Sequence, residues 1–376
     1  MNRYDLRRGT VYRARAEEVY QGLEAGSFRL ALVDGPYNLR IAEWDKFPSW
    51  DAFRDFYRGH LEAIGRLLMP SSWLLLWGSD ESEGELRPLV RSLGWEYCGR
   101  VTWHKTNPPS QKGIEDRRTW PDATEVLGCW RRECVGSLAG PAQMIAYAAG
   151  ESDRNEIRKW LHYERQRAGL KGDDLEAAVN EAGGKGNMTC RHSFTESQWC
   201  MPTWEQWKAL HVAWNRRGLP DGRPYLQRDR SRVYDLTDPA DHDALRAEYD
   251  ALRAPFEMPS GGLLNVWRDP LVWSPERLVR ADGSALHPCQ KRLDHVERLI
   301  RAHTRPGEAV LSVFSGTCRE AVVCEHLPEP EARRYVCIEA DEDGRGYIDA
   351  VLPSLRLDPT AGLKPGQVGL FSGGGR

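Results

Sequence analysis

The fold is decided by residues 28–38, FRLALVDGPYN. A run of apolar residues typical of β-strands stops abruptly at Gly35 and Pro36, which interrupt a ladder of backbone hydrogen bonds. The pattern predicts a buried strand that ends in a polar tip, with Asp34 as its first residue. Because open α/β sheets bind their ligands at strand tips, we expect a functional site here.

Helix and strand signals alternate after this strand and return near the end of the chain. Apolar residues recur at helical spacing in 49–68, 287–304 and 319–327, and short apolar strands are indicated at 71–79, 307–316 and 333–341. Alternation of this kind predicts an α/β fold with a doubly wound, Rossmann-like sheet of mostly parallel strands.

The middle of the chain has a different character, with three or four short helical patterns and many arginines. We expect one α/β domain from residues 1–150 and 260–365, a mainly helical insert at 151–259 and a flexible tail at 366–376. The helices of the insert fit either a helix-turn-helix unit, which places one helix in a DNA groove, or an ordinary helical insertion.

The composition excludes several classes of protein. The chain has 376 residues, a formal net charge of -3 and 9 cysteines, none of them in a C-x-x-C pair. No apolar run approaches the roughly 18 residues of a membrane helix, and the N-terminus lacks the apolar core of a signal peptide. We therefore expect a cytoplasmic protein without a disulfide framework and without a metal site.

The tetrapeptide Asp34-Gly35-Pro36-Tyr37 suits the methylation of an exocyclic amine, whose lone pair is delocalised into the base ring. The Asp34 carboxylate and the Gly35 carbonyl can accept the two N–H groups and hold the nitrogen in line with a methyl donor. Tyr37 offers an aromatic face to a base that has left the duplex, and such stacking returns roughly 1–3 kcal/mol. Taken alone, the tetrapeptide is also an ordinary β-turn.

Several motifs together resemble the DNA amino-methyltransferases of the β-type order, in which a D-P-P-Y motif precedes a target-recognition insert and the cofactor-binding half. The motifs run in the family's order from about Leu30 to Tyr347: VDGPYNLRIAEWD, VTWHKTN with ATEVLGCWRR, LNVWRDP, HPCQKRLDHVERLI, VFSGTCREAV and RYVCIEAD. The most specific element is H-P-x-Q-K before an apolar helix and an F-S-G turn.

The resemblance implies an S-adenosylmethionine-dependent enzyme that flips a base out of double-stranded DNA. Its catalytic residues would be Asp34, Gly35, Pro36 and Tyr37. Its cofactor would contact the turn Phe314, Ser315, Gly316 and Thr317, the ribose acceptor Glu339, and the closing segment His287, Pro288, Gln290 and Lys291. The residues expected to contact DNA are Asn38, Lys105, Lys185, Arg191, Arg216, Arg217 and Arg228. Trp103 and Asn107, beside Lys105, could also contact the flipped nucleotide or its phosphate. The alternative is that Trp103 is a buried residue at a sheet edge.

Family members that modify cytosine more often begin the tetrapeptide with serine, so Asp34 favours adenine N6 over cytosine N4.

Gly35 replaces a proline, which predicts a looser turn. The family's D-P-F-x-G-x-G becomes SVFSGTC, where Cys318 adds a side chain close to the cofactor. The alternatives are therefore a catalytically silent DNA-binding relative, or an enzyme acting on RNA or a protein amide. A second copy of the chain and a restriction endonuclease are the other partners left open.

Overall fold

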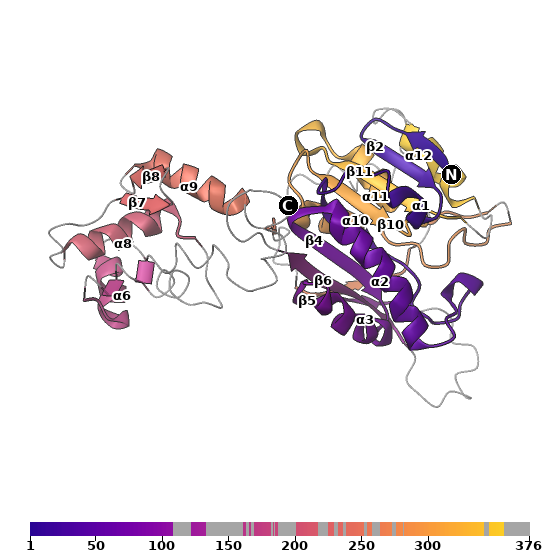
Figure 1. The fold of residues 1–376 in the computed structure, drawn as a ribbon, viewed down its shortest axis with the longest axis horizontal. Coiled ribbons are helices and arrows are strands. Elements are labelled where there is room, and N and C mark those ends of the chain that lie inside the picture. Colours follow the sequence, from indigo (N-terminus) through magenta and orange to yellow (C-terminus); the bar gives the residue numbers. More distant parts are fainter. Residues whose placement is uncertain are drawn as a thin grey trace. The chain divides into compact units, whose positions relative to one another are not determined.

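The computed structural model describes residues 1–107, 122–132, 161–162, 165–166, 169–181, 183, 185–186, 201–216, 225–228, 232–235, 238–251, 254–257, 264–272, 276–280, 282–341 and 346–356. The chain forms two compact units. The first, called the α/β unit below, contains Met1–Arg132 and Ala254–Arg376, and the second, called the inserted unit, contains Glu133–Arg253 (Figure 1).

The α/β unit is built on a nine-stranded sheet in the order β1-β2-β11-β10-β3-β4-β6-β5-β9. The strands are β1 (Asn2–Asp5), β2 (Gly9–Arg13), β3 (Phe28–Val33), β4 (Leu68–Gly78), β5 (Glu96–Lys105), β6 (Thr124–Arg132), β9 (Val266–Asp269), β10 (Ala309–Val313) and β11 (Arg334–Glu339). All run parallel except β1 and β6, which are antiparallel to their neighbours. The predicted α/β sheet is confirmed, with these two strands as the exceptions to its parallel order.

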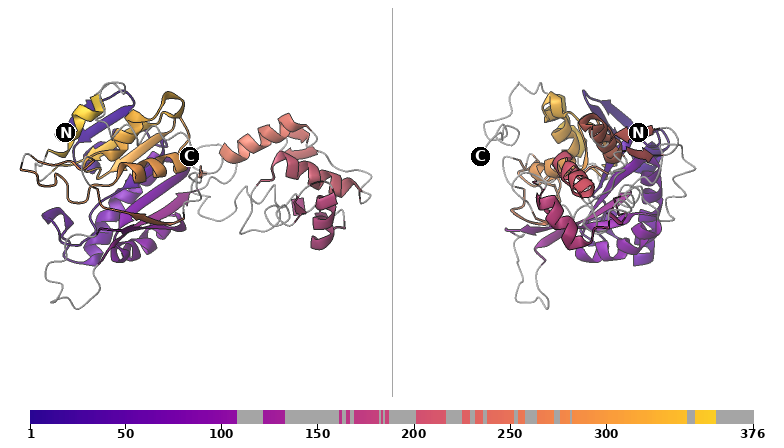
Figure 2. Two further views of the ribbon diagram at one scale, coloured as in Figure 1. Left: turned by 180° about the vertical axis from the view of Figure 1, so that it is seen from behind. Right: turned by 90° about the vertical axis from the view of Figure 1, so that its left-hand side faces the viewer.

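Helices cover both faces of this sheet (Figure 2). One face packs on α1 (Ala16–Tyr20), α2 (Trp50–Leu67) and α3 (Asp80–Ser92), and the other on α10 (Leu293–His303), α11 (Arg319–His326) and α12 (Tyr347–Arg356). Successive residues of β3 alternate between the two cores: Leu30 and Leu32 face α10–α12, whereas Ala31 and Val33 face α1–α3. A strand buried on both sides requires the continuous apolar run that the sequence shows.

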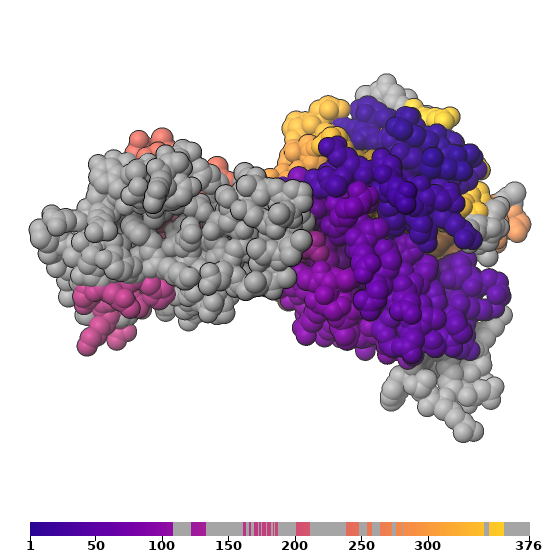
Figure 3. All heavy atoms as spheres, viewed as in Figure 1, coloured from indigo at the N-terminus to yellow at the C-terminus, as the bar shows by residue number. Residues whose placement is uncertain are grey.

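The first and last parts of the chain meet in this unit. β2 pairs with β11 and β3 pairs with β10, so segments about 300 residues apart in sequence share one sheet. In the space-filling view, the indigo N-terminal and yellow C-terminal segments lie side by side on one surface (Figure 3). The tips of β3, β10 and β11 therefore end at the same edge.

The inserted unit contains α6 (Gly172–Glu181), α8 (Trp204–Arg216), α9 (Pro239–Ala251) and an antiparallel hairpin of β7 (Tyr225–Arg228) and β8 (Arg232–Asp235). A capping box starts α8: Gln206 N donates to Thr203 Oγ1 at 3.3 Å, and Thr203 N donates to Gln206 Oε1 at 2.9 Å. His242 of α9 is buried against the ring of Trp207. The hairpin was not expected from the sequence.

Within the described ranges, no helix is both long enough and apolar enough to cross a bilayer.

Candidate active site

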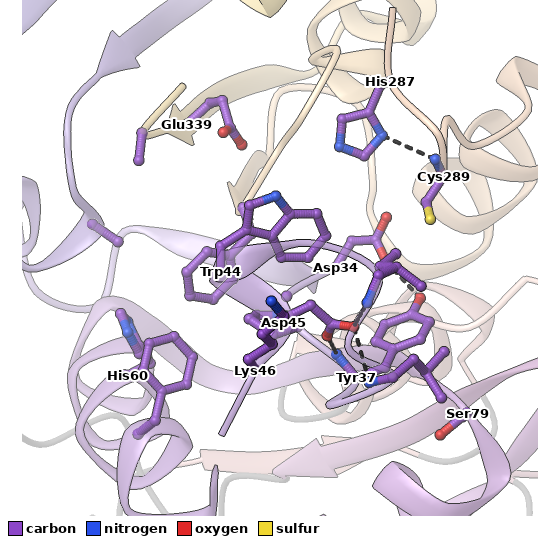
Figure 4. Close-up of a pocket in the computed structure, with 18 of the residues that line it drawn as sticks. Asp34, Tyr37, Trp44, Asp45, Lys46, His60, Ser79, His287, Cys289 and Glu339 are labelled. Atoms are coloured by element: carbon purple, nitrogen blue, oxygen red, sulfur yellow. Dashed lines mark hydrogen bonds between the residues drawn. The ribbon is translucent and has the colours of Figure 1, made fainter. Parts of the chain in front are cut away.

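A cavity of about 470 Å³ opens at the edge where β3, β10 and β11 end. Asp34, Gly35, Pro36 and Tyr37 line it after β3, and Phe314 and Glu339 line it at the ends of β10 and β11. His287 and Cys289 approach from the segment before α10, opposite Trp44 and His60 (Figure 4). The volume lies in the range of roughly 300–1,000 Å³ that is usual for small-molecule sites.

Asp34 is held by two hydrogen bonds to a single oxygen. Its Oδ1 accepts from the Tyr37 hydroxyl at 2.7 Å and from Lys291 Nζ at 2.9 Å. Within the described part of the chain, Oδ2 accepts no hydrogen bond. The carboxylate is thus fixed in orientation while one oxygen stays available in the cavity to an incoming N–H group.

Charges alternate behind Asp34. Lys291 Nζ lies 3.0 Å from Glu125 Oε2, and Lys105 Nζ lies 2.7 Å from Glu125 Oε1. Burial raises the pKa of Asp34 and outweighs the opposing charge of Lys291. Burial alone would also raise the pKa of Glu125, but Lys291 and Lys105 together lower it. Burial would lower the pKa of Lys291, yet Asp34 and Glu125 raise it, so this lysine stays protonated.

Gly35 lies in the tightest part of the turn. A Cβ atom at this position would lie 2.6 Å from the Tyr57 hydroxyl oxygen and 2.8 Å from Phe314 Cδ2. The same hydroxyl donates to the Pro36 carbonyl at 2.8 Å. The looser turn expected from glycine is therefore wrong: the missing side chain is what allows Tyr57 and Phe314 to close on the turn.

The loop after Tyr37 is organised by Asp45, which is 1% exposed. Its Oδ1 accepts from the backbone N–H groups of Tyr37 and Asn38 at 2.7 and 2.8 Å, and its Oδ2 from those of Leu39 and Ile41 at 2.9 and 3.3 Å (Figure 4). Sequence reasoning missed Asp45, because its role depends on backbone N–H groups that converge only after the loop folds.

The side of the cavity at β11 is acidic and aromatic. Glu339 accepts from the backbone N–H groups of Gly316 at 2.7 Å and Asp341 at 3.0 Å. Phe314 has a φ of 59° and its ring lies 4.9 Å from that of His60, so close packing holds an uncommon backbone conformation at the strand end. A carboxylate at a strand end suits a ribose diol, and the rings suit a flat purine, so these residues fit an adenosyl cofactor.

The glycine turn itself lies just outside the cavity. Among its residues only Phe314 lines the space, whereas Ser315, Gly316 and Thr317 do not. Ser315 Oγ donates to the carbonyl of Ser312 or Ile338, at 3.0 and 3.1 Å, and so joins the ends of β10 and β11. Cys318 is fully buried in the core at the start of α11 and does not line the cavity. Its side chain therefore does not narrow the site, contrary to expectation.

The segment before α10 divides into two parts. His287 lines the cavity and packs on Tyr347, with ring centroids 4.8 Å apart. Gln290 instead bonds the backbone, accepting from Leu278 N and donating to the Glu276 carbonyl, each at 3.0 Å. Lys291 points at Asp34 and does not line the cavity. Of the polar cofactor residues expected in this segment, the structure brings only His287 to the cavity wall.

The residues expected to contact DNA belong to both units of the chain. Lys105 lines the cavity, and the Asn38 side chain holds its own loop by accepting from Phe47 N at 3.0 Å. Lys185 is exposed in the inserted unit, where Arg216 ends α8 and Arg228 ends β7. Arg191 and Arg217 lie outside the described residues.

Trp103 and Asn107 have structural roles. The indole N–H of Trp103, which is 1% exposed, donates to the Asp269 carbonyl at 2.9 Å. Asn107 Oδ1 accepts from Leu271 N at 2.6 Å. Both residues therefore join β5 to the chain around β9, and Trp103 is buried, as the alternative to a DNA contact predicted.

Among the described residues, Asp269, Asp294 and His295 form one group with the spacing of metal ligands. Three of their side-chain contacts are ion pairs: His295 Nε2 lies 2.9 Å from Asp269 Oδ2, and Arg292 and Arg298 pair with Asp294 at 2.8 and 3.2 Å. Two guanidinium groups beside the carboxylates make this an ion-pair cluster and oppose the binding of a cation.

The fold and the cavity define a Rossmann-like α/β protein with room for a nucleoside-type ligand at its strand tips. A family model of the DNA methylases that act on N6 or N4 amino groups matches residues 28–344. The chain therefore belongs to this DNA methyltransferase family, which uses S-adenosylmethionine as its methyl donor.

Several solved structures are similar to this chain, and the first one below supports the fold. The PvuII DNA methyltransferase, described as cytosine-N4-specific, has a TM-score of 0.52 at 11% identity, covering 98% of this chain and 93% of that one. M1.HpyAVI, in a complex with SAM, has a TM-score of 0.42 at 13% identity, covering 93% and 100%. A putative DNA modification methylase from Thermus thermophilus, with S-adenosyl-L-methionine, has a TM-score of 0.44 at 14% identity, covering 92% of each chain.

Proposed function

We propose that the protein methylates the N6 amino group of adenine at a specific site in double-stranded DNA. The observation that carries the proposal is the arrangement of Asp34: one oxygen is anchored by Tyr37 and Lys291, and the other is left for a substrate in a cavity that continues to Glu339. An acceptor fixed in this way suits an amine whose nitrogen must be held in line.

The chain's own residues account for the reaction. Asp34 Oδ2 accepts one N–H of the flipped base, and the Gly35 carbonyl accepts the other, because the next carbonyl, that of Pro36, is occupied by Tyr57. Tyr37 lines the cavity beside them and offers a stacking surface. When bound, S-adenosylmethionine supplies an electrophilic methyl group. Transfer of that methyl group would form an N–C bond, break the methyl–sulfur bond and leave the sulfur as a neutral thioether. Asp34 Oδ2 would accept the proton that the positively charged nitrogen then loses.

The cofactor half of the site is assigned to the wall at β10 and β11. Glu339 binds the ribose hydroxyls, and Phe314 and His60 contact the adenine, consistent with their positions on the cavity wall. His287 closes the amino-acid end. Asp34 supports adenine over cytosine, because related enzymes that act on cytosine more often carry serine at the start of this motif.

The inserted unit is assigned to DNA recognition. It interrupts the catalytic chain at the place where the family carries its target-recognition insert, and its arginines favour contact with phosphates. Such contacts make binding salt-dependent, and a recognition site adds a preference for sequence.

Transfer of labelled methyl groups from S-adenosylmethionine to random-sequence duplex DNA, followed by nucleoside analysis, tests the proposal. We expect label in N6-methyladenine. Label in N4-methylcytosine would show that the target base is cytosine and not adenine. Preferential labelling of RNA in a competition assay would reject duplex DNA as the substrate. No transfer, with no cofactor binding, would leave a silent DNA-binding protein.

A further inference from the structure

The ammonium group of Lys291 contacts three oxygen atoms of the protein. Nζ lies 2.9 Å from Asp34 Oδ1, 3.1 Å from the Tyr37 hydroxyl oxygen and 3.0 Å from Glu125 Oε2. Two of these acceptors belong to the tetrapeptide that forms the proposed catalytic centre. Lys291 thus donates two hydrogen bonds to the tetrapeptide and forms an ion pair with Glu125.

The position of Lys291 agrees with a role inside the protein. Its side chain is 5% exposed and does not line the cavity, whereas Glu125 and Lys105 do. Nζ also lies 4.9 Å from the centre of the Trp77 ring, which closes the space behind it. Lys291 thus acts on a substrate through its partners at the cavity wall, Asp34, Tyr37 and Glu125.

We propose that Lys291 and Glu125 are positioning residues for methyl transfer, with Lys291 orienting Asp34 and Tyr37, and Glu125 holding Lys291 in place. This inference rests on the proposed function. Lys291 keeps Asp34 Oδ1 and the Tyr37 hydroxyl engaged, which turns Oδ2 toward the amine. This positioning role replaces the expectation that Lys291 contacts the amino-acid end of the cofactor.

Glu125 has a specific task in this arrangement. An ammonium group paired with Asp34 alone would move toward the centre of that carboxylate and compete for both of its oxygens. Glu125, on β6, attracts Nζ of Lys291 away from the centre of the Asp34 carboxylate, at a distance of 3.0 Å from its Oε2. The other oxygen of Glu125, Oε1, pairs with Lys105 Nζ at 2.7 Å. The four side chains alternate in sign and sum to zero net charge, which suits a buried site.

The test compares Glu125→Gln, Lys291→Met and the double variant in the full-length protein. The rate is measured for labelled methyl transfer in a single turnover, because product release limits the steady-state rate of many enzymes. Misplacement by about 1 Å costs about 100-fold in rate. We expect Glu125→Gln to slow transfer by about 10- to 100-fold, while the Kd for S-adenosylmethionine changes less than about threefold.

The double variant separates positioning from independent action. If Glu125 acts only through Lys291, the double variant is no slower than Lys291→Met alone. The matched control is Glu83→Gln, which removes another buried carboxylate that pairs with an arginine, Arg87, away from the cavity. We expect the control to lower the unfolding temperature without changing the single-turnover rate.

Three results would overturn the inference: a wild-type rate in Glu125→Gln, additive losses in the double variant, or a loss of rate that follows a loss of cofactor affinity. If the glutamine variant does not fold, Glu125→Asp keeps the charge and withdraws the oxygen by one methylene, and an unchanged rate there would contradict the inference equally. Methyl transfer by the wild-type protein is measured in parallel. If the wild type transfers no methyl group, the proposed function fails, and the inference fails with it. If the wild type is active, the variants test the inference alone.

Discussion

Gly35 is the residue at which the tetrapeptide departs from its family and at which the turn is most closely packed. A side chain there meets Tyr57 and Phe314 at distances shorter than van der Waals contact. We expect Gly35→Ala to lower the free energy of unfolding by about 1–3 kcal/mol, the usual cost of overpacking, and to slow methyl transfer.

Tyr57→Phe removes the atom nearest to the new methyl group and provides the check. In the Gly35→Ala background it should restore part of the stability in urea unfolding. In the wild-type background it should cost about 0.5–1.5 kcal/mol, because the Pro36 carbonyl loses its hydrogen bond. Equal effects of Tyr57→Phe in both backgrounds would show that the predicted contact does not form.

Glu320, in the first turn of α11, predicts a dependence of stability on pH. Burial, with a smaller contribution from the charge of Asp34, raises its pKa from 4.5 to about 7. Between these values the folded state binds more protons than the unfolded state, so the free energy of unfolding falls as pH rises, by at most about 3 kcal/mol. Below this window the carboxyl group is protonated in both states.

Glu320→Gln is neutral at every pH, and it should therefore remove this part of the pH dependence. Urea unfolding at pH 5 and pH 8 measures the difference, and the exposed Glu18→Gln serves as the control. The assignment would be contradicted if the free energy of unfolding changed by the same amount between pH 5 and pH 8 in the wild type and in Glu320→Gln.

At the scale of elements, the loop after β3 depends on one side chain. Asp45 accepts four backbone N–H groups, and Asp45→Ala leaves partly buried donors without a partner. We expect a loss of at least about 2 kcal/mol in the free energy of unfolding, and slower methyl transfer because Tyr37 loses its support. Glu43→Ala, in the same loop but exposed, should change neither quantity. Normal stability in the Asp45 variant would show that the loop is held by other contacts.

The elements that could be predicted from the sequence are those whose pattern is local. The apolar run of β3, its polar tip at Asp34 and the acid at the end of β11 each follow from neighbouring residues. Lys291 and Asp34 are 257 positions apart in the sequence. The H-P-x-Q-K motif therefore indicates that Lys291 belongs to the site, but it does not show that its side chain pairs with Asp34. Glu125 belongs to the motif ATEVLGCWRR, which the resemblance includes without giving this residue a role. Only the pairing of β5 with β6 brings Glu125 and Lys105 together.

At the scale of the molecule, the two ends of the chain form one catalytic sheet and the inserted unit interrupts it. If the insert binds phosphates, replacing Arg216, Arg217 and Arg228 by alanine should weaken DNA binding. The slope of log K against log salt should become shallower by about 0.9 for each phosphate that the variant no longer neutralises. Cofactor affinity should not change. An unaltered slope would assign DNA binding to other residues.

The most direct test of the central claim is the transfer of labelled methyl groups to duplex DNA by the wild-type protein and by Asp34→Ala, with cofactor affinity measured for both. The account predicts label in the amino group of a base for the wild type. It predicts a loss of about 10³-fold or more in the variant, with cofactor affinity retained, because the variant loses the acceptor that holds and polarises the amine. Transfer by Asp34→Ala at the wild-type rate would contradict it.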